Sequence, residues 1–191
     1  MHKSKNLTIE ETFDLAVKNH QEGKTDIVQN LYNKILEIDP NHSQTLNNLA
    51  VIFTNLKENQ KARACYEKAI KINPNYVVAH YNLGVIFRKL GENQKAKSCF
   101  KKAIEINPNY AVAHYNLGVI FRKLGENQKA KECYEKAIKI NPNDFKSYNN
   151  LGIVFRKLGE NQKARECYEK AIEINPNYTE AHNNLGVVFR K

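Results

Sequence analysis

The chain has 191 residues, 41% of them hydrophobic and 26% charged, and a formal net charge of +10. No stretch approaches the roughly 18 consecutive apolar residues of a membrane span, and the two lysines near the start precede no apolar run. These features exclude a membrane-spanning class, and we expect a soluble, cytoplasmic protein with no membrane partner.

An internal repeat organises almost the whole chain. Residues 77–110 and 111–144 differ at only six of 34 positions. The same skeleton recurs 34 residues away in both directions, and it consists of a leucine, a small residue, an aromatic residue, an alanine, a second aromatic residue, a second alanine and a proline. In 77–110 these are Leu83, Gly84, Phe87, Ala96, Phe100, Ala103 and Pro108. Such a period indicates stacked supersecondary units.

This skeleton and its period resemble the tetratricopeptide repeat. The resemblance implies an all-α fold, a right-handed superhelical solenoid of antiparallel helix pairs. We expect a polar tail over 1–8 and then a single solenoid over 9–191 without a linker. Its repeats are 9–42, 43–76, 77–110, 111–144 and 145–178, followed by a half repeat over 179–191.

The first repeat is degenerate, because Asn19 replaces an aromatic residue and Val28 and Ile35 replace the two alanines. A terminal repeat has a neighbour on one side only, so we interpret 9–42 as a cap. In each regular repeat we expect a first helix from about the second to the fourteenth position and a second helix from about the seventeenth to the thirtieth.

Turn residues mark the ends of these helices. Leu90-Gly91-Glu92-Asn93 is typical of the first turn, where glycine adopts a left-handed conformation and Asn or Glu caps the next helix. Lys57 stands at the glycine position in 43–76, which should cost that turn stability. An Asn-Pro pair ends each second helix. The asparagines predicted to cap the following helices are Asn75, Asn109, Asn143 and Asn177.

The half repeat 179–191 supplies a first helix that keeps the apolar face of an internal repeat, with Leu185, Val188 and Phe189. Uncovered side chains of this kind favour association. We therefore expect that the chain is a fragment of a longer protein and that this helix can mediate self-association.

Cysteines and histidines repeat with the same period. Cys65, Cys99, Cys133 and Cys167 are 34 residues apart, and two helix spacings of roughly 8–10 Å each exceed the roughly 7 Å Cα limit of a disulfide. We expect reduced thiols and neither metal nor cofactor. His80, His114 and His182 are expected to be half-buried packing groups. Without a catalytic constellation, we do not expect an enzyme.

A helical wheel divides each first helix into two sides. Repeat positions 4, 7, 8 and 11 pack on the second helix, and positions 2, 5, 6, 9, 12 and 13 lie opposite. The resemblance implies that the opposite side lines a concave ligand-binding groove, with valines as its floor. The predicted groove residues are Asn48, Asn82, Asn116, Asn150 and Asn184, Tyr81 and Tyr115, Arg88, Arg122 and Arg156, and Lys89, Lys123 and Lys157.

An asparagine amide offers a donor and an acceptor, which suits the backbone of an extended peptide. The asparagine ladder resembles that in the tetratricopeptide domain of O-linked N-acetylglucosamine transferases, which implies a grip on extended peptides. Alternatively, the asparagines serve only hydrogen bonding between repeats. In 111–144 the pair Arg122 and Lys123 accounts for the whole excess charge, which favours an acidic partner, unless these cations only solvate the groove.

We therefore predict a non-catalytic protein-interaction scaffold that binds an extended, acidic peptide. A carboxylate clamp is disfavoured, because tyrosine or asparagine and valine occupy its Lys and Asn positions. An alternative function is the substrate-selecting arm of a larger enzyme, such as a glycosyltransferase or a sulfotransferase. RNA binding is a third possibility, although near-identical repeats cannot encode a base sequence.

Overall fold

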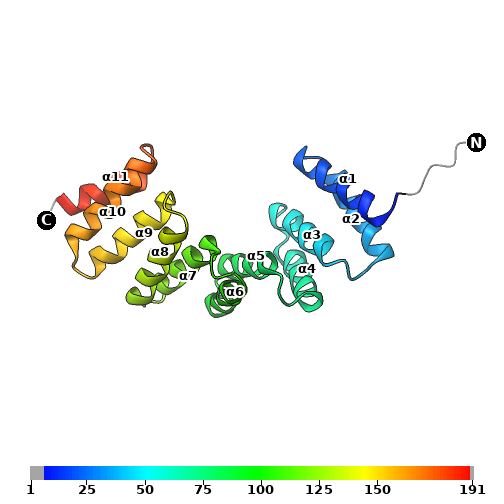
Figure 1. The fold of residues 1–191 in the computed structure, drawn as a ribbon, viewed down its shortest axis with the longest axis horizontal. Coiled ribbons are helices and arrows are strands. Elements are labelled where there is room, and N and C mark those ends of the chain that lie inside the picture. The colour runs from blue at the N-terminus through cyan, green and yellow to red at the C-terminus, as the bar shows by residue number, and fades with distance from the viewer. Residues whose placement is uncertain (1–6, 190–191) are drawn as a thin grey trace, which may run out of the picture. The chain divides into compact units, whose positions relative to one another are not determined.

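The computed structural model describes residues 7–189, and these form eleven α-helices with no strand among them (Figure 1). The helices are α1 (Ile9–Gln21), α2 (Thr25–Ile38), α3 (Ser43–Asn55), α4 (Asn59–Ile72), α5 (Val77–Lys89), α6 (Asn93–Ile106), α7 (Ala111–Lys123), α8 (Asn127–Ile140), α9 (Phe145–Lys157), α10 (Asn161–Ile174) and α11 (Thr179–Phe189). The all-α prediction is confirmed. Second helices begin and end as predicted, and first helices begin and end one residue earlier than expected.

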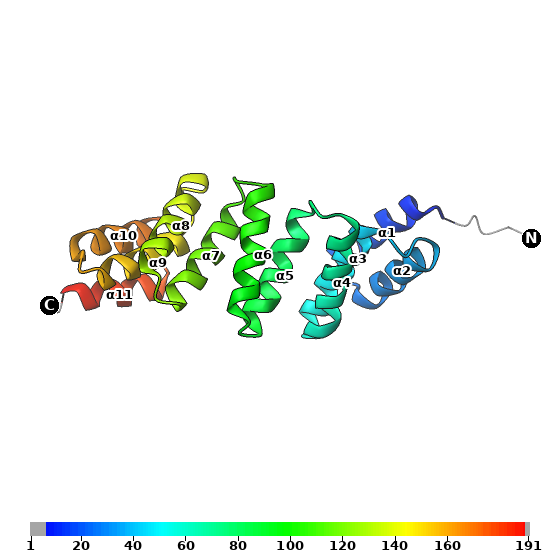
Figure 2. The same ribbon diagram turned by 90° about the horizontal axis from the view of Figure 1, so that it is seen from below.

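The chain divides into two compact units, residues 1–86 and 87–191, with the boundary inside α5. In the N-terminal unit, α1 pairs with α2 and α3 pairs with α4, and α2 also packs on α3 (Figure 1). In the C-terminal unit, α7 pairs with α8 and α9 pairs with α10 (Figure 2). There α8 also packs on α9, and α10 packs on α11. Antiparallel helix pairs therefore form both units, as the repeat predicts.

In the regular repeats, an aromatic ring between two alanines fills the centre of the helix pair, whereas Tyr32 in the first pair lies between Val28 and Ile35. Tyr134 on α8, with Ala130 and Ala137 one turn away on either side, is fully buried. Gly118 on α7 faces this ring so closely that a Cβ atom would lie 2.8 Å from Tyr134 Cε1. Burying a side chain of this size contributes roughly 1.5–3 kcal/mol. The skeleton residues of the sequence are thus the core of each pair.

The turn between the two helices of a repeat uses a residue with positive φ. Gly125 has a φ of 77° and Gly159 a φ of 80°, which glycine adopts without a steric penalty. Lys57 adopts the same conformation with a φ of 62°. The prediction that Lys57 occupies a glycine position is confirmed, and the backbone at this turn is strained.

The predicted helix caps are wrong in detail. In the four regular repeats the second helices begin after a glutamate, and at Glu126 the side chain makes no capping hydrogen bond. The Glu126 carboxylate instead pairs with Lys129 at 2.5 Å. Asn143 does not cap α9 but lies one residue before the N-cap, and its backbone N–H donates to Asn141 Oδ1 at 3.2 Å in the tight turn around the proline. Asp144 caps α9. Similarly, α7 begins after Tyr110 rather than Asn109, without a side-chain cap.

The expected polar tail falls mostly on residues 1–6, which lie outside the described residues. Thr8 begins α1 as a capping box, in which Glu11 N–H donates to Thr8 Oγ1 at 3.1 Å and Thr8 N–H donates to Glu11 Oε2 at 2.8 Å. Across residues 7–189, no helix is long and apolar enough to cross a bilayer. At the other end, Leu185 and Val188 are half-buried, and self-association through this helix stays a prediction.

Candidate functional site: the first-helix face

The predicted groove residues lie on the first helices of the repeats, and we call the surface that they form the first-helix face. In the N-terminal unit this face comprises Asn48 on α3 and Tyr81 and Asn82 on α5. In the C-terminal unit it comprises residues of α7, α9 and α11 together with the last turn of α5, which carries Arg88 and Lys89. Each unit presents its own part of the face.

In the N-terminal unit, the asparagines bind tyrosine hydroxyls of the preceding repeat. Asn48 Nδ2 donates to Tyr32 Oη at 3.1 Å. Burial raises the pKa of Tyr66 to about 12, and hydrogen bonds from Thr54 and Asn82 oppose this shift. Here the ladder ties each first helix to the second helix before it. Such bonds fix how consecutive repeats pack.

In the C-terminal unit, two ladder asparagines are buried and bond elsewhere. Asn116 is 5% exposed and its Nδ2 donates to Val112 O at 2.8 Å. Asn150 is 8% exposed, and its Nδ2 donates to Lys146 O at 2.9 Å and to Tyr115 Oη at 3.4 Å. Both amide hydrogens of Asn150 are therefore used inside the protein. The helical wheel did not predict this burial, because it considers contacts within one helix pair only. In the structure a neighbouring repeat covers Asn116 and Asn150.

Asn184 is half-buried, and its Nδ2 donates to Asn149 Oδ1 at 2.9 Å. This bond joins α11 to α9, as the bond between Asn150 and Tyr115 joins α9 to α7. Neighbouring first helices of the C-terminal unit are thus in direct contact through their amides. The asparagines of this unit set the spacing of the face.

Tyr115 stands among the charged groups of the face. It is half-buried, and burial raises the pKa of its hydroxyl. The Asp144 carboxylate also raises this pKa, whereas the guanidinium groups of Arg88 and Arg122 lower it. Its ring lies 6.0 Å from the Tyr134 ring. Tyr115 therefore links the polar surface to the buried core. Tyr81, its counterpart in the preceding repeat, is half-buried too.

The arginines lie half-buried along the same face. The Nε atoms of Arg88, Arg122 and Arg156 are enclosed without a hydrogen-bond partner. Burial raises the pKa of the Tyr134 hydroxyl, and the nearby Arg122 guanidinium opposes this shift. Arg156 acts in the same way on Tyr168. Each of these two arginines therefore rests over the buried tyrosine of its own repeat. The lysines that follow them in sequence, Lys89, Lys123 and Lys157, are exposed.

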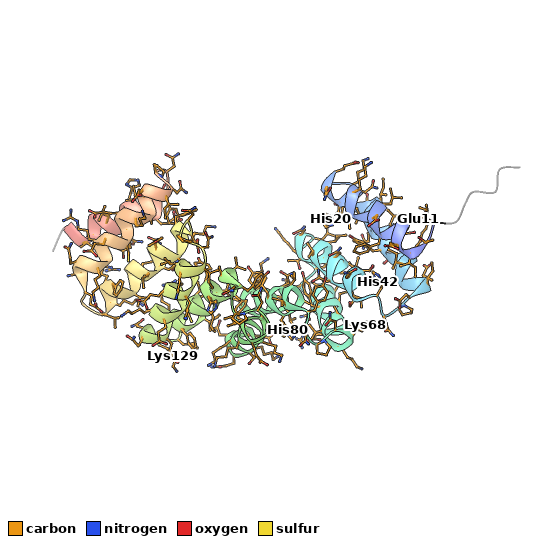
Figure 3. All side chains as sticks on the ribbon, in the orientation of Figure 1. Glu11, His20, His42, Lys68, His80 and Lys129 are labelled. Atoms are coloured by element: carbon orange, nitrogen blue, oxygen red, sulfur yellow. The ribbon has the colours of Figure 1, made fainter. Side chains whose placement is uncertain are left out.

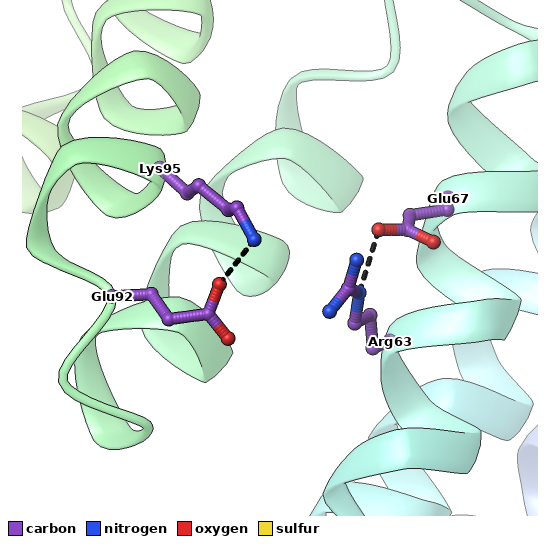
Figure 4. Close-up of polar contacts among 4 residues, drawn as sticks. All are labelled: Arg63, Glu67, Glu92 and Lys95. Carbon is purple, nitrogen blue, oxygen red and sulfur yellow. Dashed lines mark hydrogen bonds and ion pairs between the residues drawn. The ribbon is translucent and has the colours of Figure 1, made fainter.

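These six cations differ from those on the second helices, many of which are paired. Figure 4 shows two such pairs, Arg63 Nε with Glu67 Oε1 at 2.8 Å on α4 and Lys95 Nζ with Glu92 Oε2 at 2.5 Å at the start of α6. Lys129 on α8, labelled in Figure 3, pairs with Glu126 and lies 5.6 Å from the Phe121 ring centroid. Within residues 7–189, no ion pair joins any of the six first-helix cations to a carboxylate.

The sequence did not lead us to predict Asp144 as a charged group beside Tyr115 on the first-helix face. Its carboxylate oxygens accept hydrogen bonds from Lys146 N–H at 3.2 Å and from Ser147 Oγ at 2.5 Å. The signal was present, because the equivalent position holds tyrosine in three other repeats and histidine in the first. A residue that departs from a near-perfect repeat, as Asp144 does, therefore indicates a local difference in the face.

The periodic histidines, such as His114, and the cysteines lie outside this face. His114 Nε2 lies 2.9 Å from Pro108 O, a contact that fastens the preceding turn to α7. Burial raises the pKa of Cys133 and of Cys167 to about 12, so both thiols stay protonated at neutral pH. In the part of the chain that the structure describes, no group of three His, Cys, Asp or Glu side chains could hold a metal ion.

Family models for the tetratricopeptide repeat match residues 77–110, 111–144 and 145–178, the repeat bounds expected from the sequence. Related models match 51–91, 31–64 and 167–191. The chain belongs to the tetratricopeptide repeat family. Comparison with curated proteins gave no match.

Solved structures with this fold include MamA, at 29% sequence identity and a TM-score of 0.77, with 86% of this chain and 96% of the MamA chain covered. PilF of Pseudomonas aeruginosa has 22% identity and a TM-score of 0.85, covering 95% of this chain and 84% of its own. YrrB, described as a tetratricopeptide protein with an unusual peptide-binding site, has 20% identity and a TM-score of 0.77, covering 92% and 91%.

Proposed function

We propose that this protein is a non-catalytic scaffold that binds an extended, acidic peptide along the first-helix face of its C-terminal unit. The observation that carries the proposal is the set of six cations on this face that lack a carboxylate partner among the described residues. Tetratricopeptide proteins mediate protein–protein interactions. The peptide-binding site described for YrrB supports a peptide as the ligand.

The arginines supply most of the affinity in this proposal. A guanidinium group can hold a carboxylate through two parallel hydrogen bonds, and half-burial strengthens such a bond by excluding water. The exposed lysines beside the arginines add attraction at longer range. Because exposed charges are screened within about 10 Å at 0.1 M salt, the lysine contribution should weaken most as salt is raised.

The asparagines have a narrower role than a ladder of free amides. Asn150 ties α9 to α7 through the Tyr115 hydroxyl, whereas Asn116 donates to Val112 O within α7, and both asparagines are buried. The half-buried Asn184 can add a contact to a peptide backbone. The resemblance to the asparagine ladder of the glycosyltransferases enters the proposal at this residue only.

A binding experiment with charge-matched variants tests the proposal. Affinity for a library of acidic peptides is measured by fluorescence anisotropy at two salt concentrations for the native chain and for Arg88→Gln/Arg122→Gln/Arg156→Gln. The control removes as many charges from second helices, as Lys136→Gln/Lys139→Gln/Lys170→Gln. We expect the arginine variant to lose at least about tenfold in affinity and the control less than about threefold.

Equal losses in the two variants would show that net charge alone attracts the peptides. Absence of binding to any acidic peptide, with both variants folded by circular dichroism, would contradict the proposed function itself. A single-stranded RNA that binds the native chain more tightly than any peptide would make nucleic acid the better assignment.

A further inference from the structure

We infer that the peptide is recognised through acidic side chains three residues apart, one for each repeat of the C-terminal unit. This inference rests on the proposed function and specifies its ligand. It follows from two lengths, the distance between equivalent arginines and the rise of an extended chain.

The spacing of the arginines is the spacing of the first helices. Arg88, Arg122 and Arg156 occupy the same position in three consecutive repeats. Hydrogen bonds between α7 and α9 and between α9 and α11 show that these first helices are direct neighbours, and Arg88 and Arg122 both act on Tyr115 of α7. Helices in direct contact pack with their axes about 8–10 Å apart. Equivalent side chains therefore recur at about this distance along the face.

An extended peptide rises about 3.3 Å per residue, so three residues span about 10 Å. A peptide with an acidic residue at every third position can thus place one carboxylate at each arginine. Spacings of two or four residues fall about 3 Å short or long for each repeat. This error accumulates, and by the third arginine it exceeds the reach of a hydrogen bond.

The arginines are held well enough to discriminate between spacings. Each Nε is enclosed by the protein, and Arg122 and Arg156 each lie beside the hydroxyl of a fully buried tyrosine, Tyr134 and Tyr168 respectively. A guanidinium group whose Nε is enclosed by the protein keeps one orientation, whereas the ammonium group of an exposed lysine can adopt many positions. The arginines should therefore set the spacing, and the lysines should tolerate any spacing.

Asp144 confines the acidic side chains to the arginine edge of the face. Its carboxylate acts on Tyr115 from the start of α9, and it is already bonded to Lys146 N–H and Ser147 Oγ. A second carboxylate close to it would be repelled. The peptide acids are thus directed toward Arg88 and Arg122, which act on Tyr115 with the opposite sign.

The same geometry disfavours a nucleic acid. Single-stranded nucleic acids bind proteins by stacking their bases on accessible aromatic rings. Tyr134 and Tyr168 beneath the arginines are fully buried, and Tyr81 and Tyr115 on the face are half-buried, so none of these four rings is fully exposed for stacking. Carboxylates on a peptide need only the guanidinium groups.

The test compares peptide isomers with the full chain. Twenty-two-residue peptides of identical composition, with four glutamates among glycine and serine, carry the glutamates two, three, four or seven residues apart or in one block. Anisotropy titrations at a single salt concentration give their affinities. We expect the spacing of three to bind at least about fivefold more tightly than every other isomer. In the triple Arg→Gln variant this advantage should disappear, while the triple Lys→Gln control should keep it.

Equal affinity for all isomers would overturn the spacing but leave the scaffold function standing, because charge alone would then explain binding. Preference for a spacing of seven would overturn it in favour of a helical ligand, since a helix rises only about 1.5 Å per residue. If no isomer binds and the library test also fails, the proposed function falls together with the inference.

Discussion

The two units use one helical frame for two different surfaces. In the N-terminal unit, the position of the face arginine holds His20 and Thr54, whereas in the C-terminal unit it holds Arg88, Arg122 and Arg156. Residues 1–86 carry ten lysines and arginines against nine acidic residues, and residues 87–191 carry twenty against eleven. Almost all of the net charge therefore belongs to the second unit.

This exchange also changes the hydrogen bonds beneath the face. In the N-terminal unit, Thr54 and Asn82 bond the hydroxyl of Tyr66. In the C-terminal unit, Arg122 and Arg156 take this place beside the hydroxyls of Tyr134 and Tyr168, and each arginine lowers the pKa that burial of its tyrosine raises. Alanines and tyrosines therefore hold the helix pairs together in both units. The residue at the position of the face arginine decides what the face can bind.

The largest expected difference between the units appears at alkaline pH. Burial raises the pKa of Cys133 and Cys167 from 9.0 to about 12, whereas Cys65 in the N-terminal unit is only half-buried. A thiol whose pKa is raised by folding contributes stability below its unfolded pKa and loses it as pH rises through 9 toward 12. At pH 10.5 the loss should be about 2 kcal/mol for each buried thiol.

Urea unfolding at pH 8 and pH 10.5 measures this loss. Cys133→Ala/Cys167→Ala should flatten the pH dependence, although tyrosines such as Tyr66 continue to contribute in the same direction. Burial also raises the pKa of Cys65, so Cys65→Ala should flatten the dependence in the same direction but by less than either buried cysteine does. An unaltered slope in the double variant would show that the buried thiols do not control it.

The next effect concerns the residue that faces the buried tyrosine. The C-terminal unit has Gly152, where a Cβ atom would lie 2.6 Å from Tyr168 Cε1, but the N-terminal unit accommodates the fully buried Ala50 at the same position. Gly152→Ala should destabilise the protein by about 1–2 kcal/mol, because overpacking outweighs the helix propensity of alanine. Thermal unfolding gives the value, and a stabilised Gly152→Ala variant would rule out the close packing.

A smaller gain is expected at the strained turn. Lys57 has a φ of 62°, whereas the equivalent Gly91, Gly125 and Gly159 adopt this conformation freely. Lys57→Gly should therefore stabilise the protein by about 1 kcal/mol. Lys61→Gly, inside the neighbouring helix α4, serves as the control and should destabilise by a similar amount. Equal effects of the two substitutions in urea unfolding would argue against strain at this turn.

Much of the fold could be predicted because the repeat encodes it locally. Helix bounds, the glycine turns and the exceptional turn at Lys57 all follow from residues that act within one helix pair. The caps could not be assigned, since several asparagines compete at the Asn-Pro-Asn turns and the first of them accepts the bond. The sequence alone does not show which of the two asparagines accepts the hydrogen bond in this turn.

The face was predicted only in part, for a related reason. The wheel placed the arginines and asparagines together on the first helices, as the structure does. It could not distinguish the buried Asn150 from the half-buried Asn184, because their exposure depends on which neighbouring helix covers them. Contacts between repeats, unlike contacts within a pair, leave no periodic signal of their own.

The most direct test of the central claim is an NMR titration of the full chain with an acidic peptide at low salt. We expect chemical-shift changes along α7 and α9 and at Arg88 and Lys89, with little change along α1 and α3. These changes should vanish in Arg88→Gln/Arg122→Gln/Arg156→Gln. Equal changes on the first helices of both units, or changes confined to the second helices, would contradict it.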